Sequence, residues 1–191
     1  MKQIINVNKF RIRWAHGCSW LLAVAGLLAT AAASRAGAGD NRAPEVPGSI
    51  AVPASNKVHF HGFGVGVQIY TWNGASWGKA VPQATLFDNE GNVVATHFAG
   101  PTWESNSGSR VVGALVQPFT VDTNSIPWLL LSAVTSETTG PGIFAATTYI
   151  QRVNTSGGNA PANDGTEIGQ VARIPYTADY FFYTKDQQLN H

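Results

Sequence analysis

A single stretch decides the fold class: residues 57–72 read KVHFHGFGVGVQIYTW. Aromatic and β-branched residues dominate it, and Gly62, Gly64 and Gly66 occupy alternate positions within it. Because successive side chains of a strand point to opposite faces, one face of this segment lacks side chains and the other is apolar. We therefore expect a strand here, with an aromatic ring, another backbone or a ligand packed closely against the bare face.

Similar segments recur along the rest of the chain. Short runs rich in Val, Ile, Thr and aromatic residues alternate with clusters of Gly, Pro, Asn and Asp, and no ten residues keep a helical period. Residues 88–91 and 106–109 have the composition of turns and are expected to close hairpins. The runs predict about nine strands: residues 57–63, 65–72, 84–87, 92–98, 110–116, 128–134, 143–153, 167–174 and 178–183. This pattern favours an all-β fold, either a single-domain β-sandwich or a β-barrel.

The first 33 residues have the layout of a secretory signal peptide. Four basic residues precede position 14, and an uncharged stretch follows at residues 17–33. The apolar run within it is shorter than the roughly 20 residues that a membrane-spanning helix needs, so no stable membrane anchor is expected after cleavage. Cleavage after Ala33 or Ala38 would leave a protein in the periplasm or outside the cell.

The segments after the signal peptide differ in composition. Residues 34–47 are expected to form a flexible leader, residues 48–185 a single β domain, and residues 186–191 a short tail. The only cysteine, Cys18, lies in the signal region, so the mature domain is expected to be disulfide-free. Removing residues 1–33 leaves 8 basic and 11 acidic residues, a net charge of −3. This acidic balance argues against a nucleic acid partner.

Five blocks of the chain carry a resemblance: GVQIYT at 66–71, THFAGPTWE at 96–104, IPWLL at 126–130, YIQRVNT at 149–155 and PYTADYFFY at 175–183. Together they resemble a family of exported bacterial and fungal proteins known as domain of unknown function 3455. The resemblance covers nearly everything from Val46 to Tyr183 and implies a single exported domain without an assigned activity. A dehydrogenase function, a label carried by some fungal relatives, is not supported, because the glycines at 62–66 continue into a strand and do not open a helix.

Aromatic residues are the first candidates for a ligand site. Exposed together on loops, they would form a platform for a glycan or another small molecule, and the protein would be a non-catalytic binding domain. Buried, they would be core residues, which is the commoner fate of tryptophan in such a domain. The candidates are Tyr70, Trp72, Trp77, Trp103 and Trp128.

The second candidate site is a metal site formed by His59, His61, His97 and Glu104. Alternate histidines of one strand project to the same face, and imidazoles from two strands with a carboxylate can bind copper or zinc. In the alternative interpretation, His59 and His61 face solvent, His97 bonds a backbone carbonyl near the turn that follows it, and Glu104 pairs with Arg110 across a hairpin.

No catalytic residue is predicted. Residues 74–78 spell the pattern of a hydrolase nucleophile elbow, but Pro82 prevents the helix that must follow, and Asn73-Gly74 predicts a hairpin turn. The third class of function is a structural surface or matrix protein, which the lack of clustered titratable groups would fit.

Overall fold

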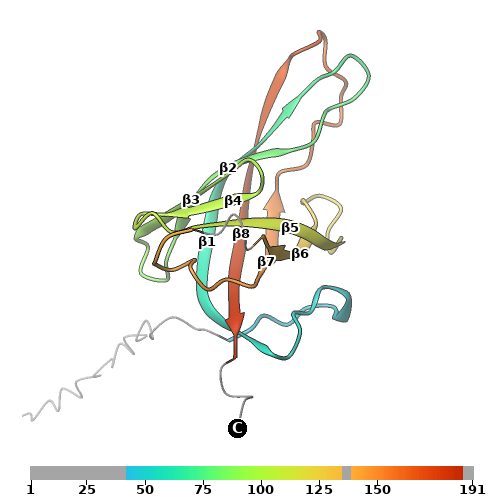
Figure 1. Ribbon diagram of the computed structural model, residues 1–191. Helices are drawn as coiled ribbons and strands as arrows, with labels where there is room; N and C mark the ends of the chain where they lie inside the picture. The colour runs from blue at the N-terminus through green and yellow to red at the C-terminus, as the bar shows by residue number, and fades with distance from the viewer. Residues whose placement is uncertain (1–41, 135–138, 187–191) are drawn as a thin grey trace, which may run out of the picture. The chain divides into compact units, whose positions relative to one another are not determined.

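The structure is a computed structural model that describes residues 42–134 and 139–186 (Figure 1). The predicted signal peptide, most of the predicted leader and nearly all of the predicted tail lie outside these residues. Within the described part of the chain, no helix is long and apolar enough to cross a membrane. The elements are η1 Gly48–Ile50, β1 Asn56–Thr71, β2 Val81–Phe87, β3 Val93–Phe98, β4 Thr102–Ser105, β5 Arg110–Phe119, β6 Trp128–Ala133, β7 Tyr149–Gly157 and β8 Val171–Lys185.

The eight strands form a closed antiparallel barrel in which neighbours in sequence are neighbours in space. Closure is made by β1 and β8, which pair from Asn56 opposite Lys185 to Thr71 opposite Val171. Closing a sheet on itself removes the unpaired edges that an open sheet would expose. The all-β prediction is confirmed, and of the two architectures predicted it is the barrel that forms.

The strand count differs from the prediction, with eight strands in the described residues where about nine were expected. Two predicted pairs of strands merge into single long strands, β1 and β8. Glycine and proline were interpreted as interruptions, but Gly64 and Pro175 continue the ladder. The four-residue strand β4 was not predicted, because so short a segment carries little periodicity.

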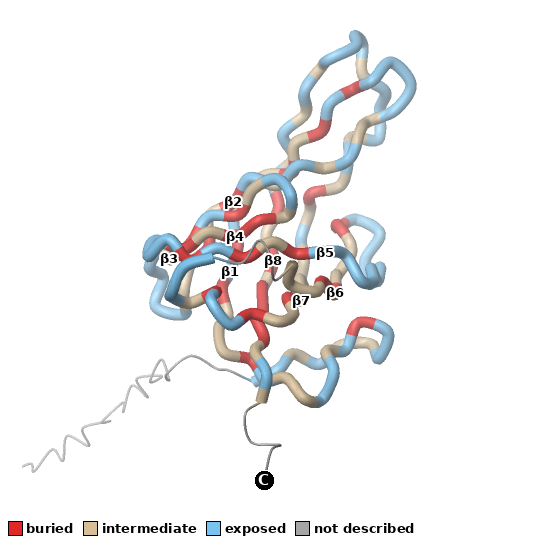
Figure 2. The backbone as a smooth tube through the Cα atoms, in the orientation of Figure 1, coloured by how far each residue is buried: buried red, intermediate tan, exposed pale blue. Residues whose placement is uncertain are grey.

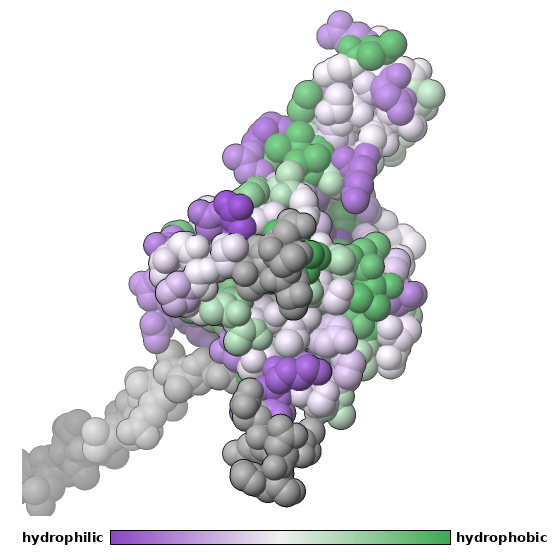
Figure 3. Space-filling view, viewed as in Figure 1, coloured by the Kyte–Doolittle hydropathy of each residue, from purple (hydrophilic) through white to green (hydrophobic). Residues whose placement is uncertain are grey.

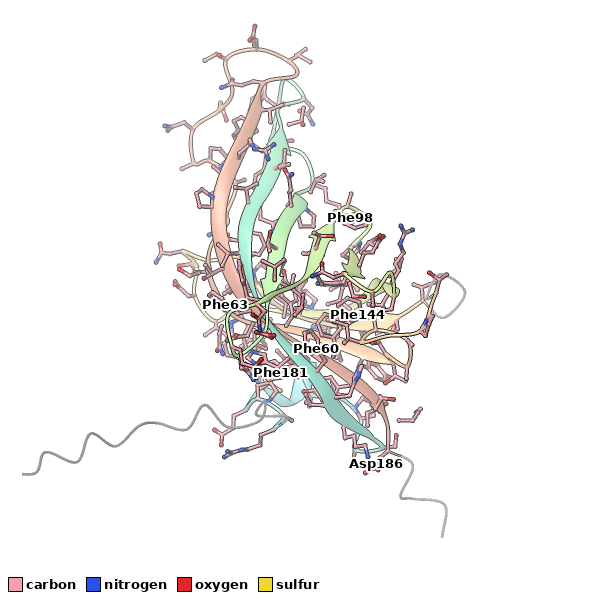
Figure 4. The ribbon with its side chains drawn as sticks, turned by 90° about the vertical axis from the view of Figure 1, so that its left-hand side faces the viewer. Phe60, Phe63, Phe98, Phe144, Phe181 and Asp186 are labelled. Carbon is pink, nitrogen blue, oxygen red and sulfur yellow. The ribbon has the colours of Figure 1, made fainter. Side chains whose placement is uncertain are left out.

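The segment before β7 also differs from the prediction. A strand was expected from residue 143, but β7 begins at Tyr149. The preceding residues turn into the barrel, where Phe144 is fully buried and packs 4.6 Å from the ring of Phe182 and 5.9 Å from that of Phe60. Figure 4 shows Phe60 and Phe144 side by side inside the barrel. Phe144 therefore fills one part of the interior.

The glycines of β1 make room for close neighbours, as their spacing predicts. A Cβ on Gly64 would lie 2.7 Å from the Tyr180 ring, and one on Gly66 would meet the backbone of Gln83. The absence of side chains at these inward positions lets Tyr180 cross the interior of the barrel.

Buried residues fall into two clusters on opposite sides of the sheet. The inner cluster fills the barrel and contains Leu86, Trp103, Leu131, Tyr180 and Phe182, among others. The outer cluster comprises Val58, Val153, Phe181 and Tyr183, with Val46, Val52, Trp128 and Tyr149 packed against it. Val46 of the predicted leader is thus part of the packing. Figure 2 shows that buried positions gather in the barrel, whereas the β1–β2 and β7–β8 connections are largely exposed.

Candidate ligand-binding site

The interior of the barrel contains a cavity of about 640 Å³. Most of its wall is apolar and comes from strands on both sides of the barrel and from the β5–β6 connection. The apolar lining includes Val81, Pro82, Pro101, Leu115, Ile126 and Leu129. Leu115 is 60% exposed and Val81 is 42% exposed although both line the cavity, so they mark its rim.

Polar side chains converge on the buried part of this cavity. They are Gln68 of β1, His97 of β3, Trp103 of β4, Arg152 of β7 and Tyr180 of β8. Their direction follows from strand alternation, because Arg152 lies two residues after the core residue Ile150, and Tyr180 lies between the core residues Ala178 and Phe182. The fold therefore places five polar groups from five strands around one space.

Arg152 is the cation of the cavity. Its Nε and Nη2 atoms donate to the carbonyl oxygen of Pro127 at 3.2 and 2.8 Å. Burial raises the pKa of Tyr180, and the positive charge of Arg152 opposes that rise. Among the described residues, the ion pairs are Lys57–Asp186, His61–Asp179 and Arg110–Glu104, so no carboxylate there forms an ion pair with Arg152.

Two buried donors at the cavity have no hydrogen-bond partner among the described residues. They are the Nε2 atom of Gln68 and the indole Nε1 atom of Trp103. Gln68 is 2% exposed and Trp103 is 1% exposed, so bulk water does not satisfy them. Most buried polar groups in proteins are hydrogen-bonded, and an unpaired buried donor costs about 1–3 kcal/mol. These two groups therefore require an explanation.

His97 is neutral and fixed in one tautomer. Its Nδ1 atom lies 2.9 Å from the carbonyl oxygen of Thr102, and because a carbonyl can only accept, the proton is on Nδ1. Burial lowers the pKa of His97 to about 3. The ring stacks on Trp103 with centroids 4.3 Å apart. His97 thus bonds a backbone carbonyl near the following turn, as one of the two sequence interpretations predicted.

The other predicted metal ligands lie apart from His97 and have their own partners. His59 contacts the Thr147 hydroxyl at 3.3 Å, and His61 contacts Asp179 Oδ1 at 2.9 Å. Glu104 pairs with Arg110 at 2.6 Å. The described residues contain no group of three or more His, Cys, Asp or Glu side chains placed to hold a metal ion. The structure does not assemble the predicted copper or zinc site, because each of these side chains contacts a different partner.

Of the five predicted aromatic residues, only Tyr70 and Trp103 line the cavity. Tyr70 donates its hydroxyl proton to the carbonyl oxygen of Gly158 at 2.7 Å. Trp72 and Trp77 pack against each other at 5.4 Å near the β1–β2 connection, and Trp128 belongs to the outer cluster. The five residues therefore do not form one platform.

Sequence reasoning missed Gln68, Arg152 and Tyr180. The available signal was alternation, since Ile150 and Arg152 occupy the same face of one strand. Which face points inward depends on pairing with β6 and β8, which the sequence of β7 alone does not specify.

Comparisons with known proteins agree with the resemblance seen in the sequence. No curated protein and no solved structure gives a significant match to this chain. One family profile matches residues 53–184, a span that begins just before β1 and ends within β8 and so includes the whole wall of the cavity. On this match, the chain belongs to the family described as protein of unknown function (DUF3455).

Proposed function

We propose that this domain binds one small, largely apolar molecule in the barrel cavity. The observation that carries the proposal is the cavity itself, about 640 Å³ of space with an apolar wall and a few convergent polar groups. Small-molecule sites are typically concave, about 300–1,000 Å³ in volume, and built in this way. A barrel of eight strands encloses a space that side chains either fill or leave free for one small ligand.

The rim of the cavity supports the same function. Leu115 lines the cavity and is largely exposed, and Val116 and Phe119 beside it on β5 are exposed as well. Figure 3 shows apolar surface over the end of β5. Exposed apolar surface that continues into a cavity favours the entry of an apolar ligand.

Binding is favoured over catalysis by the chemistry of the lining. Among the described residues, those that line the cavity include no Asp, Glu, Ser, Thr or Cys. The buried His97 donates its Nδ1 proton to a backbone carbonyl, and none of the described Ser, Thr or Cys side chains lines the cavity beside it. Covalent catalysis of the common kind requires a nucleophile and a base within hydrogen-bond distance of each other.

We further propose that binding takes place outside the cytoplasm, in the periplasm or the extracellular space. Support comes from the basic and then apolar pattern of residues 1–33, which is typical of a secretory signal peptide.

The test is saturable binding of Nile red, an uncharged apolar dye, to the domain. We expect one equivalent to bind with enhanced fluorescence, because most of the cavity wall is apolar. Leu129→Trp places a larger ring at a lining position and should weaken binding at least about tenfold, roughly 1.4 kcal/mol.

The matched control is Val93→Trp, which adds the same ring at an exposed position of β3 that does not line the cavity. It should leave dye binding within about threefold of wild type. Equal binding to both variants, or no saturable binding to the wild-type domain, would show that the cavity is not a ligand site.

A further inference from the structure

The polar groups of the cavity indicate the chemistry of its ligand. We propose that the ligand is a monocarboxylic acid with an apolar body, and that Arg152 holds its carboxylate at the buried part of the cavity. This inference rests on the proposed function and specifies the class of ligand.

The first argument is charge. Arg152 brings one positive charge into the barrel, where it bonds a neutral carbonyl and no carboxylate of the described residues. A cation that is partly removed from water, as Arg152 is, is less favourable unless an anion compensates it. A ligand with a single negative charge would balance Arg152 and leave no excess charge.

The second argument is the direction of the missing hydrogen bonds. Both unpaired buried atoms, Gln68 Nε2 and Trp103 Nε1, belong to residues that line the cavity, and both are donors. Arg152 has only donors as well. A ligand that satisfies this set must present acceptors, and an ionised carboxylate presents two oxygens with about four acceptor sites and no proton.

The third argument separates a carboxylate from a phosphate. A guanidinium is planar and matches the two oxygens of a carboxylate, and it binds either anion strongly. A phosphate monoester carries about 1.5 to 2 negative charges at neutral pH. The one further cation that lines the cavity among the described residues, Lys79, is exposed on the β1–β2 connection. One partly buried guanidinium therefore fits a monoanion.

The rest of the cavity accounts for the body of the acid. Its apolar lining continues from Leu129 and Ile126 to the exposed rim at Leu115 and Val81. Each methylene group moved from water to such a wall contributes about 0.8 kcal/mol, so an extended aliphatic or aromatic body would provide most of the affinity. The carboxylate would provide the selectivity.

The experiment compares three ligands of equal chain length, namely decanoate, decanol and decylamine, by isothermal titration calorimetry at pH 8. Wild-type protein should bind decanoate at least about tenfold more tightly than decanol, and decylamine most weakly, because only the carboxylate pairs with Arg152. Arg152→Met should weaken decanoate roughly 10–100-fold and leave decanol within about threefold. Arg173→Met removes an exposed arginine of β8 that does not line the cavity and should change neither affinity.

Two further variants keep the test valid if Arg152→Met does not fold. Gln68→Leu and Trp103→Phe each remove one unpaired donor, the first with a side chain of similar size and the second with a smaller aromatic ring. Each should weaken decanoate about three- to tenfold without weakening decanol.

The outcomes distinguish this inference from the proposed function. Equal affinity for decanoate and decanol, or a preference for decylamine, would overturn the carboxylate assignment while Nile red still binds in the cavity. Failure of Nile red and of all three ligands to bind would overturn the proposed function itself.

Discussion

Three polar side chains at the cavity are oriented by backbone carbonyls. His97 donates to Thr102, Arg152 donates to Pro127, and Tyr70 donates to Gly158. Because the barrel fixes the positions of these carbonyls, the side chains are oriented before any ligand arrives. Such preorganisation lowers the entropy lost on binding.

At the residue level, we predict that acid destabilises the domain through His97. Burial lowers the pKa of this side chain to about 3, whereas an unfolded histidine titrates near 6.5. Below pH 6.5 the unfolded chain binds a proton that the folded chain does not. The free energy of unfolding therefore decreases as the pH is lowered from 6.5 to about 3. From pH 7 to pH 5 this contribution should be about 2 kcal/mol. Urea unfolding of wild type and His97→Gln at both pH values measures it as the difference between the two pH dependences.

Other groups do not mimic this effect. Burial also lowers the pKa of His59, but His59 is present in both proteins and its contribution cancels in the comparison. Burial tends to raise the pKa of Asp179, but bonds from His61 and Asn154 lower it overall, so its contribution is lost only in more acidic solution. A His97→Gln protein with the same pH dependence as wild type would contradict the prediction.

At the level of elements, the β1–β2 connection is held against the segment before β8 by two tryptophans. Trp72 is buried beneath Gly165, where a Cβ would overlap its ring, and the indole of Trp77 donates to the carbonyl oxygen of Asn163 at 2.9 Å. Backbone bonds from Trp72 to Gln170 and from Gly169 to Trp72 join the same two segments. These contacts lie beyond the barrel core and stabilise the projecting part seen at the top of Figure 1.

Trp77→Ala should therefore release this connection without unfolding the barrel. We expect the amides of Trp72 and Gly169 to exchange with solvent hydrogen at least about tenfold faster, because local opening then costs less free energy. The amide of Tyr180 in the barrel should keep its rate. Phe63→Ala, which removes an exposed aromatic ring of β1, is the control and should change neither. Unchanged exchange at Gly169 in Trp77→Ala would show that the indole does not hold the segment.

The elements that were predicted best from the sequence are the turns, whose conformation depends on a few neighbouring residues. The turn at 88–91 forms with Gly91 at φ 84° and its amide bonded to Asp88, and Gly108 likewise adopts φ 85° in the next predicted hairpin. These outcomes depend on one or two residues each. Strand limits depend on partners, so two long strands were divided at their glycines and prolines, and β4 was missed.

The candidate site was predictable only in part for the same reason. The bond of His97 to a carbonyl and the Glu104–Arg110 pair were among the alternatives derived from sequence, because both involve residues close in the chain. The convergence of Gln68 with Arg152 was not, since they lie on strands joined only through the closure of β1 with β8. A one-residue shift of either pairing would turn them outward.

For the molecule as a whole, the cavity places a functional feature inside the core that stabilises the fold. The same barrel interior holds Phe144, Phe182 and Leu131 in close packing and leaves Arg152 and Gln68 around an open space. A partly buried cation and unpaired buried donors are destabilising without a ligand. Groups that lower the stability of the fold but line a cavity are typical of a binding site, where the requirements of stability and of function conflict.

This conflict predicts that ligand and protein stability are linked through Arg152. If decanoate binds only the folded protein, it should raise the unfolding free energy of wild type by about 2.7 kcal/mol at 100 times its dissociation constant. Without ligand, Arg152→Met should lose no more than about 1 kcal/mol relative to wild type, since the bonds lost to Pro127 are offset by removal of a partly buried charge. At the same decanoate concentration it should gain much less than wild type. Urea midpoints of both proteins with and without decanoate provide the four values needed. If Arg152→Met were destabilised by several kcal/mol and wild type did not respond to decanoate, Arg152 would instead serve to brace the β5–β6 connection at Pro127, because its bonds to that carbonyl would then be its main contribution.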